Sequence, residues 1–310
     1  MNFRSMEYFT AVARIKNITK AAAHLHIAQQ TLSAHIAALE QELDCQLLIR
    51  HVPLELTYAG QVFLRYALEF QAKYNSLQQE FMDIAGNQSG QLRVSISPVR
   101  GRTIMPPIID SFRKQFPRIT IQLSEAANDD LPQKLLNGEA DIAIGNLWTS
   151  NPEIELRSFY SEEVALLVSD ALLTELYQER AEHVIRQVSA GNLAALTGCP
   201  FLFNGTDNIA GRIGRHLLQQ AQMTPTINVQ SVNIETLLFL CLRGVGACFC
   251  PKNLIEAALT PEQPTTVQVF RFGEAAHYPI RFGFLKQSYQ WSIVSAFMDI
   301  ASELMKQADK

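Results

Sequence analysis

The chain has 310 residues, of which 47% are hydrophobic and 18% charged, and its formal net charge is −4. This length allows two or three domains of roughly 100–150 residues each, and the composition excludes a mostly disordered chain. No stretch approaches the roughly 20 consecutive apolar residues of a membrane-spanning helix, and the first residues lack the pattern of a signal peptide. We therefore expect a cytoplasmic protein that contacts no membrane.

The charge distribution gives no general sign of nucleic-acid binding. Residues 1–60 hold five basic and five acidic side chains, so any role in binding DNA must rest on motif and geometry. The five cysteines show no metal-ligand spacing, and their odd number favours reduced thiols. We expect no metal and no cofactor.

The first 60 residues predict three short helices with tight joins. Apolar residues recur at helical spacing from Met6 to Ala13, a second helix is expected at Thr19–His26 and a third at Gln29–Leu43. In the third helix, apolar residues spaced by four, three and four form one inward stripe. They are Leu32, Ile36, Leu39 and Leu43.

Residues 61–85 contain no glycine or proline, and their large apolar side chains repeat every 3.5 residues on average. This pattern predicts one long helix, and its period is typical of a helix that pairs with a second copy. An amphipathic helix packed on its own domain would show a similar pattern, so both interpretations stay open. The glycines and polar residues of Gly86–Gly90 predict a flexible joint.

From Leu92 onward, strands and helices alternate, which indicates crossover connections, largely parallel sheets and two lobes around a cleft. The strands are expected at Leu92–Ser97, Ile119–Glu125, Asp141–Asn146, Glu163–Ser169, Phe201–Asn204, Ile227–Gln230, Ala247–Pro251, Val267–Phe272 and Ile280–Leu285. The helices are expected at Thr103–Phe116, Asp130–Leu136, Arg212–Gln222, Ile234–Arg243 and Trp291–Lys306. We expect the chain to cross between the lobes near Ser158–Glu163 and Thr266–Phe272.

The segment Thr19–Ile36 carries the most specific pattern in the chain. A short helix, a tight turn and a second helix with an apolar inner face form a helix-turn-helix. The outward face of the second helix holds small and polar side chains, which would let it approach a major groove and contact base edges. An ordinary helical hairpin with polar residues facing water would look the same. The outward residues are Gln29, Gln30, Thr31, Ser33, Ala34 and Ala37.

The stretch Ile18–Leu48, continuing to Leu56–Gly60, resembles the N-terminal winged helix-turn-helix of the LysR-type transcriptional regulators. The matching residues are Ala21, Ala22, Leu25, Gln29, Leu32, Ser33, Ile36, Leu39, Glu40, Leu43, Leu47, Leu48 and Arg50, followed by Leu56, Thr57 and Gly60. The resemblance implies an α/β protein with three parts. These are a winged helix-turn-helix domain at 1–60, a coiled-coil linker helix and hinge at 61–90, and a two-lobed effector domain at 91–310.

The two-lobed domain resembles periplasmic solute-binding proteins, with lobe I at about 91–162 plus 268–310 and lobe II at about 163–267. The resemblance implies a sequence-specific regulator that binds double-stranded promoter DNA and a small-molecule effector. It also implies a homodimer through residues 61–85, a homotetramer and contact with RNA polymerase. The candidate DNA-contacting residues are Thr19, Lys20, Gln29, Gln30, Thr31, Ser33, Ala34, Arg50 and His51.

The effector is expected between the lobes, where loops follow the strands of both. A strand end that leads into a helix N-terminus favours an anion, and Arg100 or Arg102 would add a bidentate partner. A plain capped turn with surface arginines is the alternative. The candidate effector-binding residues implied by the resemblance are Ser97, Pro98, Val99, Arg100, Asn146, Asn204, Gly205 and Thr206.

Four departures from the family pattern stand out. Ala28 replaces the serine that commonly caps the recognition helix, and Ala34 stands where a basic residue is common. The wing, His51–Glu55, is short and has no arginine. An extra helical stretch at about 170–190 follows Ser169, and it would either cover the cleft or extend an oligomer contact.

Three other functions are less well supported by the sequence. The first is a small-molecule-binding module with a vestigial DNA-binding domain, which is the main alternative. The second is an enzyme, for which no nucleophile elbow, phosphate-binding loop or metal motif is present. The third is a redox sensor. Cys248 and Cys250 share one face of an expected strand but cannot readily form an unstrained disulfide, so we interpret them as buried apolar residues.

Overall fold

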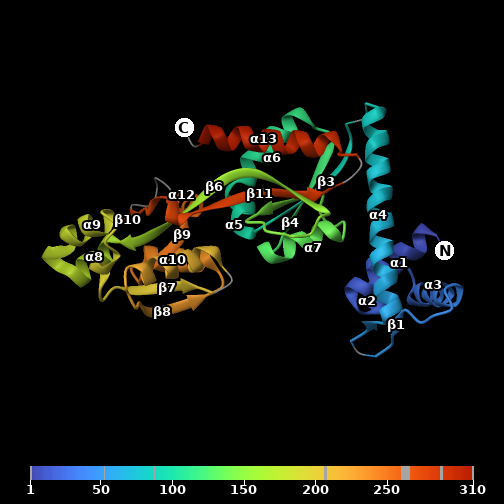
Figure 1. Ribbon diagram of the computed structural model, residues 1–310, viewed down its shortest axis with the longest axis horizontal. Helices are drawn as coiled ribbons and strands as arrows, with labels where there is room; N and C mark the ends of the chain where they lie inside the picture. Colours follow the sequence, from blue (N-terminus) through green and yellow to red (C-terminus); the bar gives the residue numbers. More distant parts are fainter. Residues whose placement is uncertain are drawn as a thin grey trace.

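The computed structural model describes residues 2–51, 53–86, 88–205, 208–259, 266–286 and 289–308. The molecule is elongated: a small helical domain at the N-terminus connects through one long helix to two α/β lobes that lie side by side (Figure 1). The α/β class and the predicted order of these parts are confirmed. In the described part of the chain, no helix combines the length and the apolar character needed to cross a membrane.

The N-terminal domain contains three helices and a two-stranded antiparallel wing. Leu32, Ile36 and Leu39 are buried as the apolar stripe predicts, whereas Leu43 at the helix end is 37% exposed. Gly60 is required by space, because a Cβ atom there would lie 2.1 Å from the carbonyl oxygen of Leu47. The elements are α1 (Phe3–Ile15), α2 (Ile18–His24), α3 (Gln29–Glu42), β1 (Leu48–Ile49) and β2 (Glu55–Leu56).

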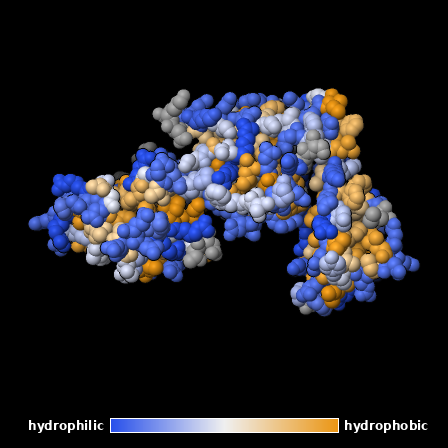
Figure 2. All heavy atoms as spheres, viewed as in Figure 1, coloured by the Kyte–Doolittle hydropathy of each residue, from blue (hydrophilic) through white to orange (hydrophobic). Residues whose placement is uncertain are grey.

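The long helix α4 runs from Tyr58 to Ile84, so it begins three residues before the predicted segment. Its first turns pack on α1 through buried Phe63 and Ala67. The other repeating apolar residues of the helix stay exposed, and hydrophobic atoms are visible on the surface of this part of the molecule (Figure 2). The exposed fractions are 50% for Tyr66, 44% for Phe70, 42% for Tyr74, 50% for Leu77, 62% for Phe81 and 73% for Ile84.

The nine remaining strands in the described part of the chain form one continuous sheet that runs through both lobes. In lobe I, β3 (Gly90–Ile96) pairs in parallel with β4 (Ile119–Glu125) and β5 (Ile142–Gly145). In lobe II, β7 (Pro200–Asn204) pairs in parallel with β8 (Thr226–Ser231) and β9 (Ala247–Pro251).

Two long antiparallel strands join the lobes. Strand β6 (Ile154–Ser169) pairs with β11 (His277–Leu285) along its first ten residues, then with β9 and β10 (Val267–Phe270) in lobe II. The chain therefore crosses between the lobes near Ser158–Glu163, as expected: β6 pairs with β11 up to Glu163 and with β9 from Val164, as one continuous strand. The return crossing follows β10 and includes a 3₁₀ turn, Gly273–Ala276.

Helices cover the sheet, and two of them differ from prediction. A short helix α5 (Pro98–Thr103) already begins where a loop was expected, and α12 (Lys252–Ala258) was not predicted. The extra stretch forms α8 (Asp170–Tyr177) and α9 (Ala181–Ser189), which lie at the end of lobe II away from lobe I (Figure 1), so they do not cover the junction between the lobes. The other helices are α6 (Met105–Gln115), α7 (Leu131–Leu136), α10 (Ile209–Gln220), α11 (Ile234–Leu242) and α13 (Ser292–Ala308).

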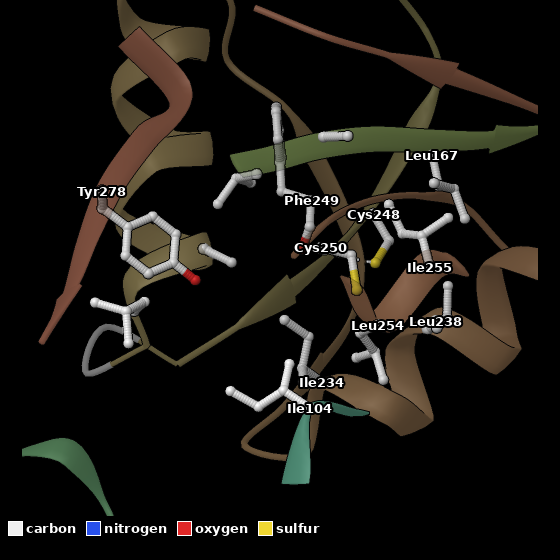
Figure 3. Packing of buried hydrophobic residues seen from close by; sticks show 14 of the residues in the cluster. Ile104, Leu167, Ile234, Leu238, Cys248, Phe249, Cys250, Leu254, Ile255 and Tyr278 are labelled. Atoms are coloured by element: carbon white, nitrogen blue, oxygen red, sulfur yellow. Dashed lines mark hydrogen bonds between the residues drawn. The ribbon is translucent and has the colours of Figure 1, made fainter. Parts of the chain in front are cut away.

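One apolar core extends across both lobes and includes four of the cysteines. Cys248 and Cys250 are fully buried free thiols, not joined in a disulfide. They lie on the same side of β9, among Leu254, Ile255 and Leu238 (Figure 3). A hydrogen bond with Cys250, together with burial, raises the pKa of the Cys248 thiol well above its ordinary value. A protonated, buried thiol is a poor nucleophile, so the interpretation of these cysteines as core residues is confirmed.

Candidate nucleic-acid interface and lobe junction

Helix α3 presents the surface that the sequence predicts for DNA contact. Gln29, Gln30, Thr31 and Ala34 are exposed and Ser33 is half-buried, while Leu32 and Ile36 anchor the opposite side in the core. Thr19 and Lys20 are exposed in the first turn of α2, the helix that precedes α3. The helix therefore offers small and amide-bearing side chains on one rigid face, as major-groove reading requires.

The first turn of α3 has no side-chain cap. Ala28 occupies the N-cap position with φ −68° and ψ 140°, an ordinary cap conformation, but it has no oxygen to accept a backbone N–H. By contrast, the side chain of Asn17 caps α2 by accepting from Lys20 N at 2.9 Å. The structure therefore confirms that α3 begins without a side-chain cap, as the sequence predicts.

The two candidate residues of the wing are partly engaged within the chain. Arg50 donates to Glu40 at 2.7 Å, and the same carboxylate accepts from the backbone N–H groups of Leu47 and Leu48. His51 is exposed and lies 3.6 Å from Glu55. Arg50 is thus held against the N-terminal domain by Glu40, and its side chain remains 56% exposed. To contact a phosphate, the guanidinium would either share this ion pair or leave Glu40.

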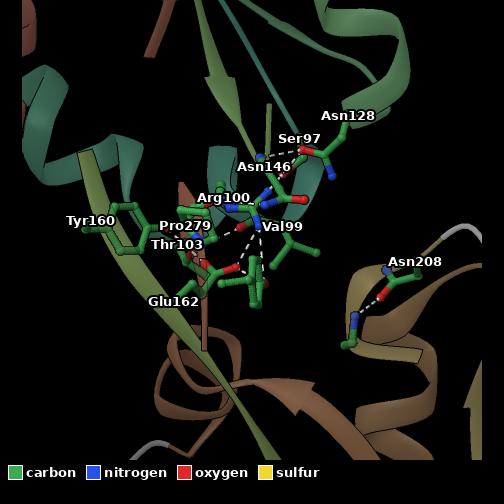
Figure 4. A network of polar contacts seen from close by, with 12 residues as sticks. Ser97, Val99, Arg100, Thr103, Asn128, Asn146, Tyr160, Glu162, Asn208 and Pro279 are labelled. Carbon is green, nitrogen blue, oxygen red and sulfur yellow. Dashed lines mark hydrogen bonds and ion pairs between the residues drawn. The ribbon is translucent and has the colours of Figure 1, made fainter. Parts of the chain in front are cut away.

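At the junction of the lobes, Arg100 lies in a buried polar network (Figure 4). Its guanidinium donates to Glu162 at 2.7 Å, and the two side chains are only 4% and 2% exposed. Ser97 accepts a further bond from Arg100 at 2.8 Å, and Tyr278 donates to the same Glu162 oxygen that receives Arg100. Tyr160 donates to the other carboxylate oxygen at 2.9 Å.

The carboxylate of Glu162 sets the electrostatics of this network. Burial opposes the charge of Arg100, but the nearby carboxylate outweighs it and raises the pKa of the guanidinium. Burial and the same carboxylate raise the pKa of both tyrosines well above its ordinary value. The network is therefore an ion pair with two neutral hydroxyl donors, and its charges already compensate each other.

Both arginines that were expected to meet an anion form ion pairs within the chain. Arg100 is paired with Glu162, and Arg102 on α5 forms an ion pair with Glu235 on α11, across the junction in lobe II. The helix that begins at Pro98 has only six residues, and its Ser97 cap side chain accepts from Arg100 rather than from the backbone. Each of the two guanidinium groups is therefore paired with a carboxylate of the chain itself.

The other candidate effector residues lie at strand ends in both lobes. Asn146 at the end of β5 is half-buried and donates to the carbonyl of Pro279 at 2.8 Å. Asn204 at the end of β7 is buried, with its amide directed to the carbonyl of Val232. Pro98 is exposed, and Val99 and Gly205 are half-buried, whereas Thr206 lies outside the described residues.

Four residues of this region were missed by the sequence reasoning: Asn128, Tyr160, Glu162 and Tyr278. The side-chain oxygen of Asn128 accepts from Asn146 N at 3.1 Å and lies 3.5 Å from the Arg100 guanidinium. A glutamate pair before an apolar strand, Glu162 and Glu163, was the available signal, because a carboxylate entering a buried strand requires a partner.

The N-terminal domain and the two-lobed domain each match a known protein family. Residues 3–61 match the family described as bacterial regulatory helix-turn-helix protein, lysR family, and residues 85–306 match the LysR substrate binding domain. The chain belongs to the LysR family. Its members are DNA-binding transcriptional regulators with an effector-binding domain, and so is this protein.

Full-length relatives share this organisation at low identity. The LysR-type chain is 27% identical to the uncharacterized HTH-type transcriptional regulator YcgK of Bacillus subtilis, over 99% of this chain and 96% of that protein. It is 27% identical to the probable cat1 operon transcriptional activator of Acinetobacter lwoffii, over 82% and 81%. It is 24% identical to the HTH-type transcriptional regulator IlvY of Escherichia coli, over 97% and 98%.

Solved structures of LysR regulators show the same fold. Full-length CbnR in complex with its target DNA superposes with a TM-score of 0.61 at 24% identity, covering 98% of this chain and 99% of that one. A full-length OxyR variant from Pseudomonas aeruginosa gives a TM-score of 0.72 at 18% identity, with 97% and 94% covered.

Proposed function

We propose that this LysR-type regulator reads its operator through the exposed face of α3. The observation that carries this proposal is the arrangement of Gln29, Gln30 and Thr31 on the solvent side of a helix whose other side is anchored by Leu32 and Ile36. Gln amides pair with adenine edges, and hydroxyl groups contact bases or phosphates. Thr19, Lys20, Ser33, Ala34, Arg50 and His51 complete the proposed interface.

The proposed division is a DNA-binding domain at 1–60, a linker at 61–90 and an effector domain at 91–310. Two chains pair through the exposed apolar residues of α4, and two such dimers form a tetramer on promoter DNA. A groove of about 490 Å³ beside this face, lined by Leu43, Tyr58, Tyr66 and Phe70 among others, continues the apolar surface onto the N-terminal domain. Because residues 1–60 carry no net charge, linked domains are needed for affinity.

The proposed effector is a small polar molecule bound at the lobe junction. The amides of Asn128, Asn146 and Asn204, with Ser97, supply hydrogen-bonding groups there, and Arg100 and Arg102 are already paired with carboxylates. An anionic effector therefore gains Arg100 or Arg102 as a cationic partner by displacing Glu162 or Glu235. In this proposal, the bound effector changes the contacts of the protein with promoter DNA, and RNA polymerase is a further partner. The protein acts in the cytoplasm and performs no catalysis of its own.

Fluorescence anisotropy tests this proposal with the intergenic duplex next to the gene and a shuffled duplex, both at about 150 mM salt because affinity depends on ionic strength. We expect nanomolar binding and at least about a 100-fold preference for the intergenic duplex. Substituting Gln30→Ala should reduce that preference, while Gln78→Ala on the exposed side of α4 serves as a matched control. Equal, weak binding to both duplexes would contradict the proposal and favour a small-molecule-binding module.

A further inference from the structure

One short segment of lobe I touches both the lobe junction and the DNA-binding domain. It comprises the 3₁₀ turn Asn128–Asp130, helix α7 (Leu131–Leu136) and the turn that continues to Glu139. We call it the bridging segment. Its two ends make polar contacts with different parts of the chain, and its middle is buried in one apolar cluster.

The first end of the bridging segment belongs to the junction. The side-chain oxygen of Asn128 accepts from Asn146 N at 3.1 Å and from Arg100 at 3.5 Å (Figure 4). Close approach is possible because residue 145 is glycine: a Cβ atom there would lie 2.5 Å from this oxygen. A change in the position of the end of β5 or of Arg100 would therefore alter the hydrogen bonds of Asn128.

The middle of the bridging segment is rigidly seated. Leu131 and Leu135 are fully buried in a small apolar cluster with Ala143 and Leu147, separate from the main core. At the far end, Arg93 fixes the turn by donating to the carbonyl of Gly138 while it holds Asp141 through two hydrogen bonds. A six-residue helix is about 9 Å long, so a displacement at one end reaches the other without bending.

The second end of the bridging segment contacts the DNA-binding domain. Arg14, in the last turn of α1, donates to the carbonyl of Asn137 at 2.5 Å and lies 3.6 Å from the Glu139 carboxylate. Lys134 holds Glu139 in place at 3.1 Å. A groove of about 860 Å³, lined by α4 on one side and by α7 and β11 on the other, lies beside this contact.

We infer that the bridging segment couples effector occupancy at the lobe junction to the orientation of the DNA-binding domain through Arg14. The inference rests on the proposed function and adds its route of regulation. An effector that takes over a hydrogen bond of Asn128 moves the helix as a rigid body, and the Asn137–Glu139 turn then tightens or releases Arg14. The thermodynamic consequence is a coupling between Asn128 and Arg14 in DNA affinity.

A double-mutant cycle on DNA affinity tests this coupling without an effector in hand. The probe is the intergenic duplex, and Asn128→Ser is introduced into the wild-type, Arg14→Ala and Arg4→Ala backgrounds. Arg4→Ala is the matched control, because it removes the same charge from the other end of α1, where the described residues give it no contact with lobe I. Glu139→Gln replaces Arg14→Ala in a parallel cycle, and thermal unfolding checks that each variant is folded.

The expected result is that Asn128→Ser changes Kd about fivefold in the wild-type and Arg4→Ala backgrounds, and less than about twofold in the Arg14→Ala and Glu139→Gln backgrounds. An equal change in all backgrounds, or no change in any, would overturn the coupling while leaving DNA binding intact. Failure of the wild-type chain to bind the duplex specifically would overturn the proposed function, and the coupling with it.

Discussion

The carboxylate of Glu162 lies 2.7 Å from the guanidinium of Arg100, in a place where both side chains are almost completely buried. Glu162 belongs to the strand that joins the two lobes, and Arg100 belongs to the helix that follows the first strand of lobe I. The pair therefore fixes the start of the effector domain to the connection between its lobes. It also determines how much positive charge the junction can offer a ligand.

Replacing Glu162 by glutamine should destabilise the effector domain strongly. The substitution preserves shape but leaves the buried charge of Arg100 without its counter-ion, which costs roughly 3–5 kcal/mol when one partner of a buried pair is lost. Urea unfolding of the two proteins measures the difference. Glu235→Gln is the control, because its partner Arg102 is 61% exposed and such pairs contribute less than about 1 kcal/mol. Equal losses in both variants would contradict the assigned role of burial.

Restoring a cap to the recognition helix should stabilise the N-terminal domain. Ala28→Ser places a hydroxyl where the backbone already has the required conformation, and such a cap contributes about 1 kcal/mol. A rise in Tm of the N-terminal transition is the expected readout. Ala38→Ser, an exposed position inside the same helix, should lower stability slightly, because serine is a weaker helix former than alanine. A similar effect at both positions would show that the cap site is not the cause.

Charges on the apolar face of α4 should separate the proposed dimer. Phe70→Glu combined with Leu77→Glu places carboxylates on two side chains that are half-exposed in the single chain. Sedimentation velocity should then report a species near the chain mass of 34.7 kDa, and DNA affinity should fall by about 100-fold as the linked second domain is lost. Gln78→Glu, exposed on the same helix, should leave both measurements unchanged. A double variant that remains dimeric would place the interface elsewhere.

Asp83, in the last turn of α4, should control the titration of Tyr289. Asp83 accepts from Ser292 N at 2.9 Å, from the Ser292 hydroxyl at 2.8 Å and from the Tyr289 hydroxyl. That last bond is the main reason why the pKa of Tyr289 is raised to about 12. Burial alone would raise the pKa of Asp83, but the bonds from Tyr289 and Ser292 outweigh it and lower the value.

The signs of these two shifts define a pH window for the contact. The raised pKa of Tyr289 means that its contribution to stability is complete below about pH 10 and is lost as the pH rises toward 12. The lowered pKa of Asp83 means that its contribution is present above pH 3.8 and is lost as the pH falls further. In Asp83→Asn, Tyr289 should titrate closer to 10, as followed by NMR of ring-labelled tyrosine with Tyr289→Phe to assign the signal. An unchanged titration would show that the bond does not form in solution.

Much of the architecture follows from local patterns. The stripe Leu32, Ile36 and Leu39 places α3 on the core, and the absence of glycine and proline over 61–85 allows one unbroken helix. Strands β4 and β9 have the predicted ends, because β4 alternates apolar and polar residues and β9 is a short, fully buried apolar run. The missing cap at Ala28 was equally visible, since a cap depends on one residue and its immediate backbone.

The lobe junction was decided by tertiary structure. Residues 154–162 mix charged, polar and apolar side chains, and they form a strand because β11, more than 100 residues later, provides the hydrogen-bonding edge. Arg100 was predicted as a ligand for an anion because its local sequence shows a cation after a strand, whereas its carboxylate partner lies 62 residues away in the chain. Local sequence determines where helices, caps and turns form. The pairing of buried charges depends on which distant segments the fold brings together, and burial then makes that pairing obligatory.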